Sequence, residues 1–161
     1  MPKNRAPKAT DPEGRMGVYK RLADVPDRYR LHHHADAYEG LEVWAEFMSY
    51  EREEYGYDSY RYEQNSATCE HRWKEHMADR GRHHALAQPA DVETFMSGLL
   101  DRMKVETAYQ TYWSRLEAFY DWLQWHTEHP HHYHPVLMAA AESEYAALLV
   151  WEEKIGKNDK R

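Results

Sequence analysis

A run of apolar side chains at helical spacing between Val105 and His126 constrains the fold of this chain more than any other feature. Its members recur every three or four residues, and most of them are aromatic. They are Val105, Ala108, Tyr109, Tyr112, Trp113, Leu116, Phe119, Tyr120 and Leu123. This pattern predicts a long amphipathic helix with a wide apolar face. Pro130 and Pro135 bound the histidine-rich segment that ends it.

The remaining patterns predict further helices around this one. We expect helices over residues 38–55, 60–80 and 89–103, and a last helical stretch from about Val136 to Trp151 or Ile155. The chain holds thirteen Tyr and six Trp but a single Ile, so residues typical of strands are scarce. The sequence therefore predicts an all-α fold, a single bundle of about five helices.

The ends of the chain differ from this central part in composition. Residues 1–17 are rich in Pro, Gly and charge, which is typical of a flexible basic arm. We expect the helical domain to span residues 18–155 and a charged tail to follow over 156–161. A single cysteine, Cys69, excludes an intrachain disulfide. With no long apolar run and no secretory signal, the sequence predicts a cytoplasmic protein without a membrane span.

Charge is distributed unevenly along the chain. Residues 1–30 carry eight basic against four acidic side chains, whereas residues 31–63 carry two against nine. The formal net charge of the whole chain is −7, which disfavours nonspecific binding to phosphates. Tyr55, Tyr57, Tyr60 and Tyr62 lie in or beside the acidic segment, and tyrosines are enriched at protein interfaces.

One edge of the helix predicted over 105–126 is polar. It carries Thr107, Gln110, Thr111, Ser114 and Arg115. Short hydroxyls, an amide and a guanidinium suit a helix placed against a DNA groove, where they can donate hydrogen bonds to phosphates or base edges. The alternative is an ordinary solvated face.

Several motifs appear in an order found in tyrosine recombinases. Asn65-Ser66-Ala67-Thr68 is followed by Arg72-Trp73 and, later, by Arg80-Gly81. Asp91-Val92 with Phe95 comes next, then the polar edge from Thr107 to Arg115 with Phe119-Tyr120-Asp121-Trp122-Leu123. His134-Pro135-Val136 stands where that family often has Asn-Pro. Over Leu41 to Ala141 the chain thus resembles the core-binding domain of phage integrases.

This resemblance implies a SAM-like helical bundle that grips double-stranded DNA. The implied DNA-binding residues are Ser66, Thr68, Arg72, Arg82, His83, His84, Lys104, Thr107, Gln110, Thr111, Ser114 and Arg115. The family's catalytic tyrosine, arginines, lysine and histidines have no ordered counterpart after Ala141. We therefore expect a non-enzymatic DNA-binding protein without a cofactor, an accessory or regulator of recombination or of a mobile element, which acts as a homo-oligomer or with a recombinase partner. The alternative is a protein-interaction module, including a homodimer, that has lost DNA binding.

Histidine supplies a third hypothesis. Twelve are present, and His126, His129, His131, His132 and His134 lie close together in the sequence. Imidazoles are common ligands of Zn²⁺. Pro130 interrupts the helical spacing that would fix two ligands on one face, so a solvated turn is the favoured interpretation of this segment and no metal is expected.

Overall fold

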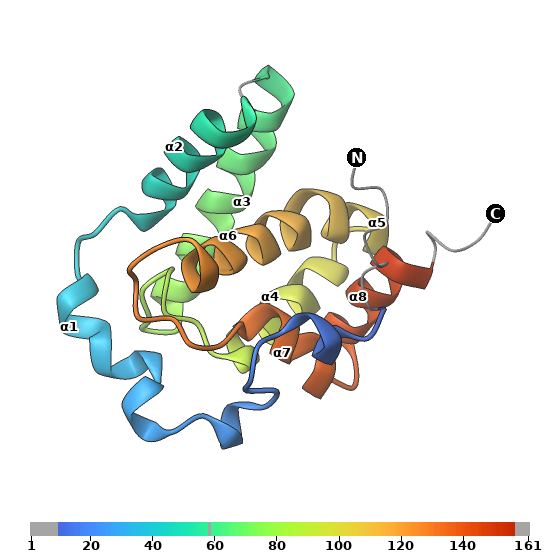
Figure 1. Cartoon of the computed structure of the whole chain (residues 1–161). Coiled ribbons are helices and arrows are strands. Elements are labelled where there is room, and N and C mark those ends of the chain that lie inside the picture. Colours follow the sequence, from blue (N-terminus) through green and yellow to red (C-terminus); the bar gives the residue numbers. More distant parts are fainter. Residues whose placement is uncertain (1–9, 58, 157–161) are drawn as a thin grey trace, which may run out of the picture.

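The computed structural model describes residues 10–57 and 59–156, and within these residues it contains helices and no strand (Figure 1). The helical elements are η1 (Pro12–Arg15), η2 (Leu22–Asp24), η3 (Asp27–Tyr29), η4 (Leu31–His34), α1 (Ala35–Tyr38), α2 (Val43–Tyr55), α3 (Tyr60–Asp79), α4 (Pro89–Leu100), α5 (Val105–Thr107), the π-helical η5 (Ala108–Trp113), α6 (Ser114–Trp125), α7 (Pro135–Glu142) and α8 (Ala146–Gly156). The all-α prediction is confirmed. None of these helices combines the length and the apolar character that crossing a bilayer requires.

The central helical run is the one with the strongest sequence pattern. α5, η5 and α6 follow one another without a break from Val105 to Trp125, and these bounds agree closely with those of the predicted helix. The stripe is the centre of the core, where Trp113, Leu116 and Phe119 have no exposed surface. Residues that recur at helical spacing are buried on one face because neighbouring helices cover that face.

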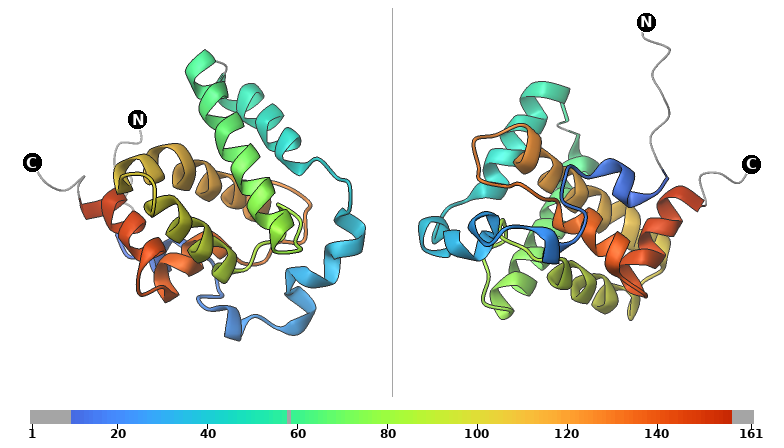
Figure 2. Two further views of the ribbon diagram at one scale, coloured as in Figure 1. Left: turned by 180° about the vertical axis from the view of Figure 1, so that it is seen from behind. Right: turned by 60° about the horizontal axis from the view of Figure 1, so that its bottom comes forward.

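α2 and α3 form an antiparallel pair that projects from one side of the body (Figures 1 and 2). α3 matches the predicted helix over 60–80 almost residue for residue. The helix predicted over 38–55 instead begins at Val43, because Gly40 takes a left-handed conformation with φ +81°. The residues before that turn form the separate short helix α1.

α4, α7 and α8 pack together against the other side of the α5–η5–α6 run (Figure 1). The last predicted helical stretch is divided in two, and Glu93 of α4 supplies the physical reason. Its carboxylate accepts a hydrogen bond from Ser143 Oγ at 2.8 Å and from the backbone N–H groups of Ala146 and Ala147 at 3.0 and 2.8 Å. The start of α8 is thus capped from another helix rather than by its own sequence.

The segment before α1 lies along the body and contributes to the core. Met16, Val25 and Leu31 are buried, and Trp151 Nε1 of α8 donates to the backbone oxygen of Thr10 at 2.9 Å. The predicted arm falls partly on residues 1–9, outside the described residues, but residues 10–17 pack against the bundle instead of extending from it. Of the predicted tail, residues 157–161 also lie outside, and Gly156 belongs to α8.

Candidate functional site

The four cations expected to converge on DNA lie on different parts of the fold. Arg72 belongs to α3, Arg82 to the loop before α4, Lys104 to the turn before α5 and Arg115 to α6. Arg82 Nε lies 2.9 Å from Oδ2 of Asp91, and Arg115 Nη1 lies 3.1 Å from Oε1 of Glu51. Both carboxylates are buried, so these two guanidinium groups neutralise internal charges. A continuous patch made by all four is not formed.

Three other residues of the predicted DNA face point inward. Ser66 and His84 are buried, and His84 Nε2 accepts a hydrogen bond from the backbone N–H of Trp44 at 3.2 Å. Burial, with nearby positive charge, lowers the pKa of His84 to about 3, so this imidazole is neutral near pH 7. His83 is half-buried and donates from Nε2 to the backbone oxygen of Leu41 at 2.9 Å. The prediction that these residues contact DNA is corrected here, because Ser66 and His84 are buried and both ring nitrogens of His83 are hydrogen-bonded within the fold.

The rest of the predicted face is at least partly exposed. This group consists of Thr68, Arg72, Lys104, Thr107, Gln110, Thr111 and Ser114. The hydroxyls of Thr68 and Ser114 donate to the backbone oxygens four residues earlier in their own helices. Arg72 lines a hollow of about 200 Å³ between α3 and α4 together with Arg102, Glu75 and Asp79, so its surroundings carry both signs of charge.

In the histidine-rich segment after α6, His129, His131 and His134 each form hydrogen bonds with different residues of the bundle. His131 Nε2 donates to the backbone oxygen of Ala85 at 2.7 Å, and His134 Nε2 donates to that of Glu117 at 3.2 Å. His129 bonds to Tyr38 and Glu46 through its two ring nitrogens. These imidazoles do not converge on one point, and the burial of His131 and His134 shows that the favoured interpretation of the segment as a solvated turn is wrong. They fix the loop onto the bundle.

The loop over residues 82–88, here termed the buried loop, is a polar centre inside the molecule. The hydroxyl of Tyr120 accepts from the N–H of Ala87 at 3.1 Å and donates to the oxygen of His84 at 2.8 Å. Trp73 Nε1 donates to the same oxygen at 2.9 Å. A buried backbone group without a hydrogen-bond partner lowers the stability of the fold by about 1–3 kcal/mol. The side chains of Tyr120 and Trp73 avoid this cost by forming the hydrogen bonds that water would form in the unfolded chain.

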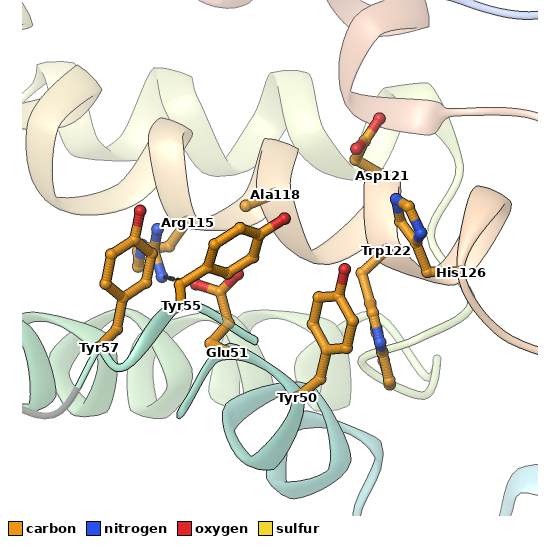
Figure 3. A pocket seen from close by; sticks show the side chains of 9 residues that line it. All are labelled: Tyr50, Glu51, Tyr55, Tyr57, Arg115, Ala118, Asp121, Trp122 and His126. Atoms are coloured by element: carbon orange, nitrogen blue, oxygen red, sulfur yellow. Dashed lines mark hydrogen bonds and ion pairs between the residues drawn. The ribbon is translucent and has the colours of Figure 1, made fainter. Parts of the chain in front are cut away.

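A hollow of about 320 Å³ lies between the α2–α3 pair and α6, and its side chains are mostly aromatic or charged (Figure 3). We term it the tyrosine groove. Its lining residues are Tyr50, Glu51, Tyr55, Tyr57, Arg115, Ala118, Asp121, Trp122 and His126. The volume is at the lower end of that of ligand-binding pockets.

One end of the tyrosine groove is fixed by a buried polar triad. Oε1 of Glu51 accepts from Arg115 Nη1 at 3.1 Å and from the hydroxyl of Tyr62 at 2.6 Å. The Arg115 guanidinium also lies over the Tyr62 ring, 4.7 Å from its centroid. Burial and the bond to Glu51 raise the pKa of Tyr62 to about 12, which keeps its hydroxyl protonated. The triad links α2, α3 and α6, and so holds the helices that form this end of the groove in fixed relative positions.

The remaining wall of the groove presents aromatic faces. The Tyr55 and Tyr57 rings are stacked with centroids 5.3 Å apart, and the Tyr50 ring stacks on His126 at 5.8 Å. Figure 3 shows the three tyrosine rings in a row along α2 and the segment after it, and the exposed carboxylate of Asp121 across the groove near Tyr50 and His126. Tyr55 and Tyr57 are 55% and 44% exposed, so large apolar parts of both rings are left uncovered on the surface.

The chemistry of the groove is that of a binding site for a cation. Aromatic faces attract cations through their electron-rich surfaces, and the Asp121 carboxylate adds negative charge. Among the residues that the structure describes, no serine, threonine or cysteine lines the groove, so this lining offers no activated nucleophile of those types.

Searches of protein-family models, of curated proteins and of solved structures gave no match to this chain. The resemblance to the integrase core-binding domain therefore rests on the sequence motifs alone. Sequence reasoning singled out Tyr55, Tyr57 and Tyr62 as an adhesive segment but assigned Arg115 to DNA. No local signal connects Arg115 to Glu51, which lies 64 residues earlier in the chain.

Proposed function

We propose that this protein is a protein-interaction module that takes up a lysine or arginine side chain of an extended partner segment in the tyrosine groove. The observation that carries this proposal is the exposed, stacked pair Tyr55–Tyr57 beside the Glu51–Arg115–Tyr62 triad, in a groove whose other end holds Asp121. The triad keeps the groove in one shape before a partner arrives. A preformed site loses less conformational entropy on binding than a flexible one.

The charge around the groove supports a basic partner. α2 carries the exposed acidic side chains Glu46, Glu53 and Glu54, and residues 31–63 are the most acidic part of the chain. Complementary charge accelerates encounter and disfavours acidic partners. A phosphate backbone would meet these carboxylates as like charges, so the groove favours a basic peptide over nucleic acid.

A peptide library displayed on phage and selected against the protein tests this proposal. We expect the selected peptides to contain a Lys or Arg within an extended segment, and replacement of that residue by Glu to abolish binding. Binding of the labelled peptide is then measured by fluorescence anisotropy for the Tyr55→Ala/Tyr57→Ala variant. We expect a Kd at least about tenfold higher than for the unaltered protein, which is about 1.4 kcal/mol.

Tyr60→Ala is the matched control, because Tyr60 is 80% exposed on the same pair of helices but does not line the groove. The control should bind the peptide as the unaltered protein does. Selected peptides without a basic residue, or equal binding by the double variant and the control, would overturn the proposal.

A second candidate function is the binding of duplex DNA through a smaller face than the resemblance implies. Lys104, Thr107 and Gln110 are exposed along the start of the α5–η5–α6 run. Arg72 and Arg102 line the hollow between α3 and α4 and lie near Tyr112 of the same helical run. As parts of this second candidate function, we also propose the SAM-like integrase type for the bundle and a cytoplasmic location for the protein.

Anisotropy of labelled duplex DNA over a salt series tests this second candidate. DNA binding through this face predicts an affinity that falls with salt and that is lost in Arg72→Glu/Lys104→Glu. The variant Tyr55→Ala/Tyr57→Ala should bind DNA normally. No binding at low salt would remove this candidate while leaving the peptide proposal intact.

A further inference from the structure

The segment before α1 gathers three side chains that ligate metals. Asp27 of η3 and His32 and His33 of η4 each offer a ligand atom, and these atoms all lie within 4.8 Å of one another. His33 Nε2 and Asp27 Oδ2 are 2.9 Å apart, and the rings of His32 and His33 have centroids 4.1 Å apart. Among the described residues, this is the one group of three or more His, Cys, Asp or Glu that meets such a criterion.

The backbone beneath this group is fixed by contacts that do not involve the three side chains. Arg30, between η3 and η4, donates from Nη2 to the oxygen of Leu22 at 2.8 Å and from Nε to that of Val25 at 3.2 Å. Leu31 is 1% exposed and anchors the start of η4 in the core. The Tyr29 ring stacks on His132 at 4.0 Å. The two short helices are thereby held in one relative position, which sets the positions of the three ligands.

We propose that Asp27, His32 and His33 form a surface site for a divalent transition-metal ion of the Zn²⁺ class. Two imidazoles and one carboxylate are a ligand set that suits such ions, and three protein ligands leave a fourth position for water or for a group from a partner. Ligand atoms around a tetrahedral Zn²⁺ are roughly 3.3 Å apart. Asp27 and His33 are already near this spacing, and the other separations, which are at most 4.8 Å, need to shorten by up to about 1.5 Å. Asp27 and His33 are 81% and 43% exposed, and rotation about their side-chain bonds supplies this movement.

The bonding at the site changes consistently when the metal binds. Without metal, the proton on His33 Nε2 is hydrogen-bonded to the Asp27 carboxylate. In the complex, the neutral ring carries its proton on Nδ1, so that Nε2 and the carboxylate can each donate a lone pair to the ion. No electron is transferred. The ion would tie η3 to η4 and so brace the segment that covers the histidine-rich loop, independently of the tyrosine groove.

Isothermal titration calorimetry with Zn²⁺ on the full chain at pH 7.5 tests the site. We expect one Zn²⁺ per chain, and a Kd at least about tenfold higher in Asp27→Asn and in His33→Ala. His71→Ala is the control, because His71 is exposed on α3 and lies outside the group. Its affinity should equal that of the unaltered protein.

A second measurement keeps the result interpretable if a variant is less stable. Zn²⁺ should raise the Tm of the unaltered protein and of His71→Ala, but not that of His33→Ala, because only an ion bound to the folded state stabilises it. In NMR spectra of the histidine side chains, the ring nitrogens of His32 and His33 should shift on addition of Zn²⁺. Unchanged affinity in Asp27→Asn and His33→Ala, or shifts confined to other histidines, would overturn the proposal.

Discussion

The buried loop and the tyrosine groove are made from the same kinds of side chain and use them in opposite ways. In the buried loop, Tyr120 is fully buried, and its hydroxyl bonds to two backbone groups of residues 84 and 87. In the groove, the Tyr55 ring is 55% exposed and its outer face is open. Tyrosine stabilises the fold where its polar atom is satisfied internally, and it is available to a partner where its ring is left uncovered.

The charged groups of the two regions show the same contrast. Asp91, beside the buried loop, has no exposed surface and is bonded to Arg80, Arg82 and the backbone N–H of Gln88. Glu51 is also buried and paired, but it shares its end of the groove with an open aromatic wall. We therefore expect substitutions near the buried loop to affect stability and substitutions in the groove to affect binding.

Asp91→Ala should cause the largest loss of stability. It removes the carboxylate that caps α4 and that pairs with two arginines whose side chains are about a third exposed. Because water can reach those arginines, the cost is below that of stranding a fully buried charge, and we expect about 3 kcal/mol. Urea unfolding followed by circular dichroism measures it. Asp101→Ala, at the exposed far end of the same helix, should change stability little.

Tyr120→Phe should lower the free energy of unfolding by about 2 kcal/mol. It removes the hydroxyl oxygen, and two buried backbone groups then each lose a hydrogen bond. Tyr60→Phe is the control, since its hydroxyl belongs to an 80% exposed side chain. The same urea measurement compares the two variants. Equal stabilities would show that the backbone of the buried loop finds other partners.

Acid should destabilise the protein through two buried histidines, His84 of the buried loop and His131, which donates to that loop. Burial lowers the pKa values of His84 and His131 to about 3, whereas both should titrate near 6.5 when unfolded. The unfolded chain therefore binds more protons between pH 6.5 and 3, and stability falls as the pH falls through that range. Each histidine contributes about 1.4 kcal/mol per pH unit.

Unfolding free energies at pH 7.5 and 5.5 measure this dependence. His131→Gln keeps an amide that can donate to Ala85 and removes one titrating group, so its stability should depend less on pH than that of the unaltered protein. The same pH dependence in both proteins would contradict the assignment of this effect to His131.

Tyr55→Ala/Tyr57→Ala should have the smallest effect on stability, within about 0.5 kcal/mol, because both rings are exposed. Its effect on the binding of a basic peptide should nevertheless be the largest of all these variants. A loss of stability as large as that of Tyr120→Phe would mean that the two rings support the α2–α3 pair, and the contrast between the regions would fail.

The sequence by itself determined the all-α class and several helix boundaries, because these depend on local spacing. The stripe from Val105 onward, Pro89 at the start of α4 and the glycines after α2 and α3 mark elements that the structure contains. The sequence also predicts the tyrosine-rich segment as a contact surface, which the binding experiments above test.

The tertiary structure decided which polar residues are available for function. Arg115, Arg82 and His84 resemble surface residues in sequence, yet their partners Glu51, Asp91 and the backbone of Trp44 lie in other elements. The division between α7 and α8 depends likewise on Glu93, about fifty residues earlier. The physical reason is that periodicity reports which face of a helix is apolar, whereas pairing and burial depend on which distant elements the fold brings together.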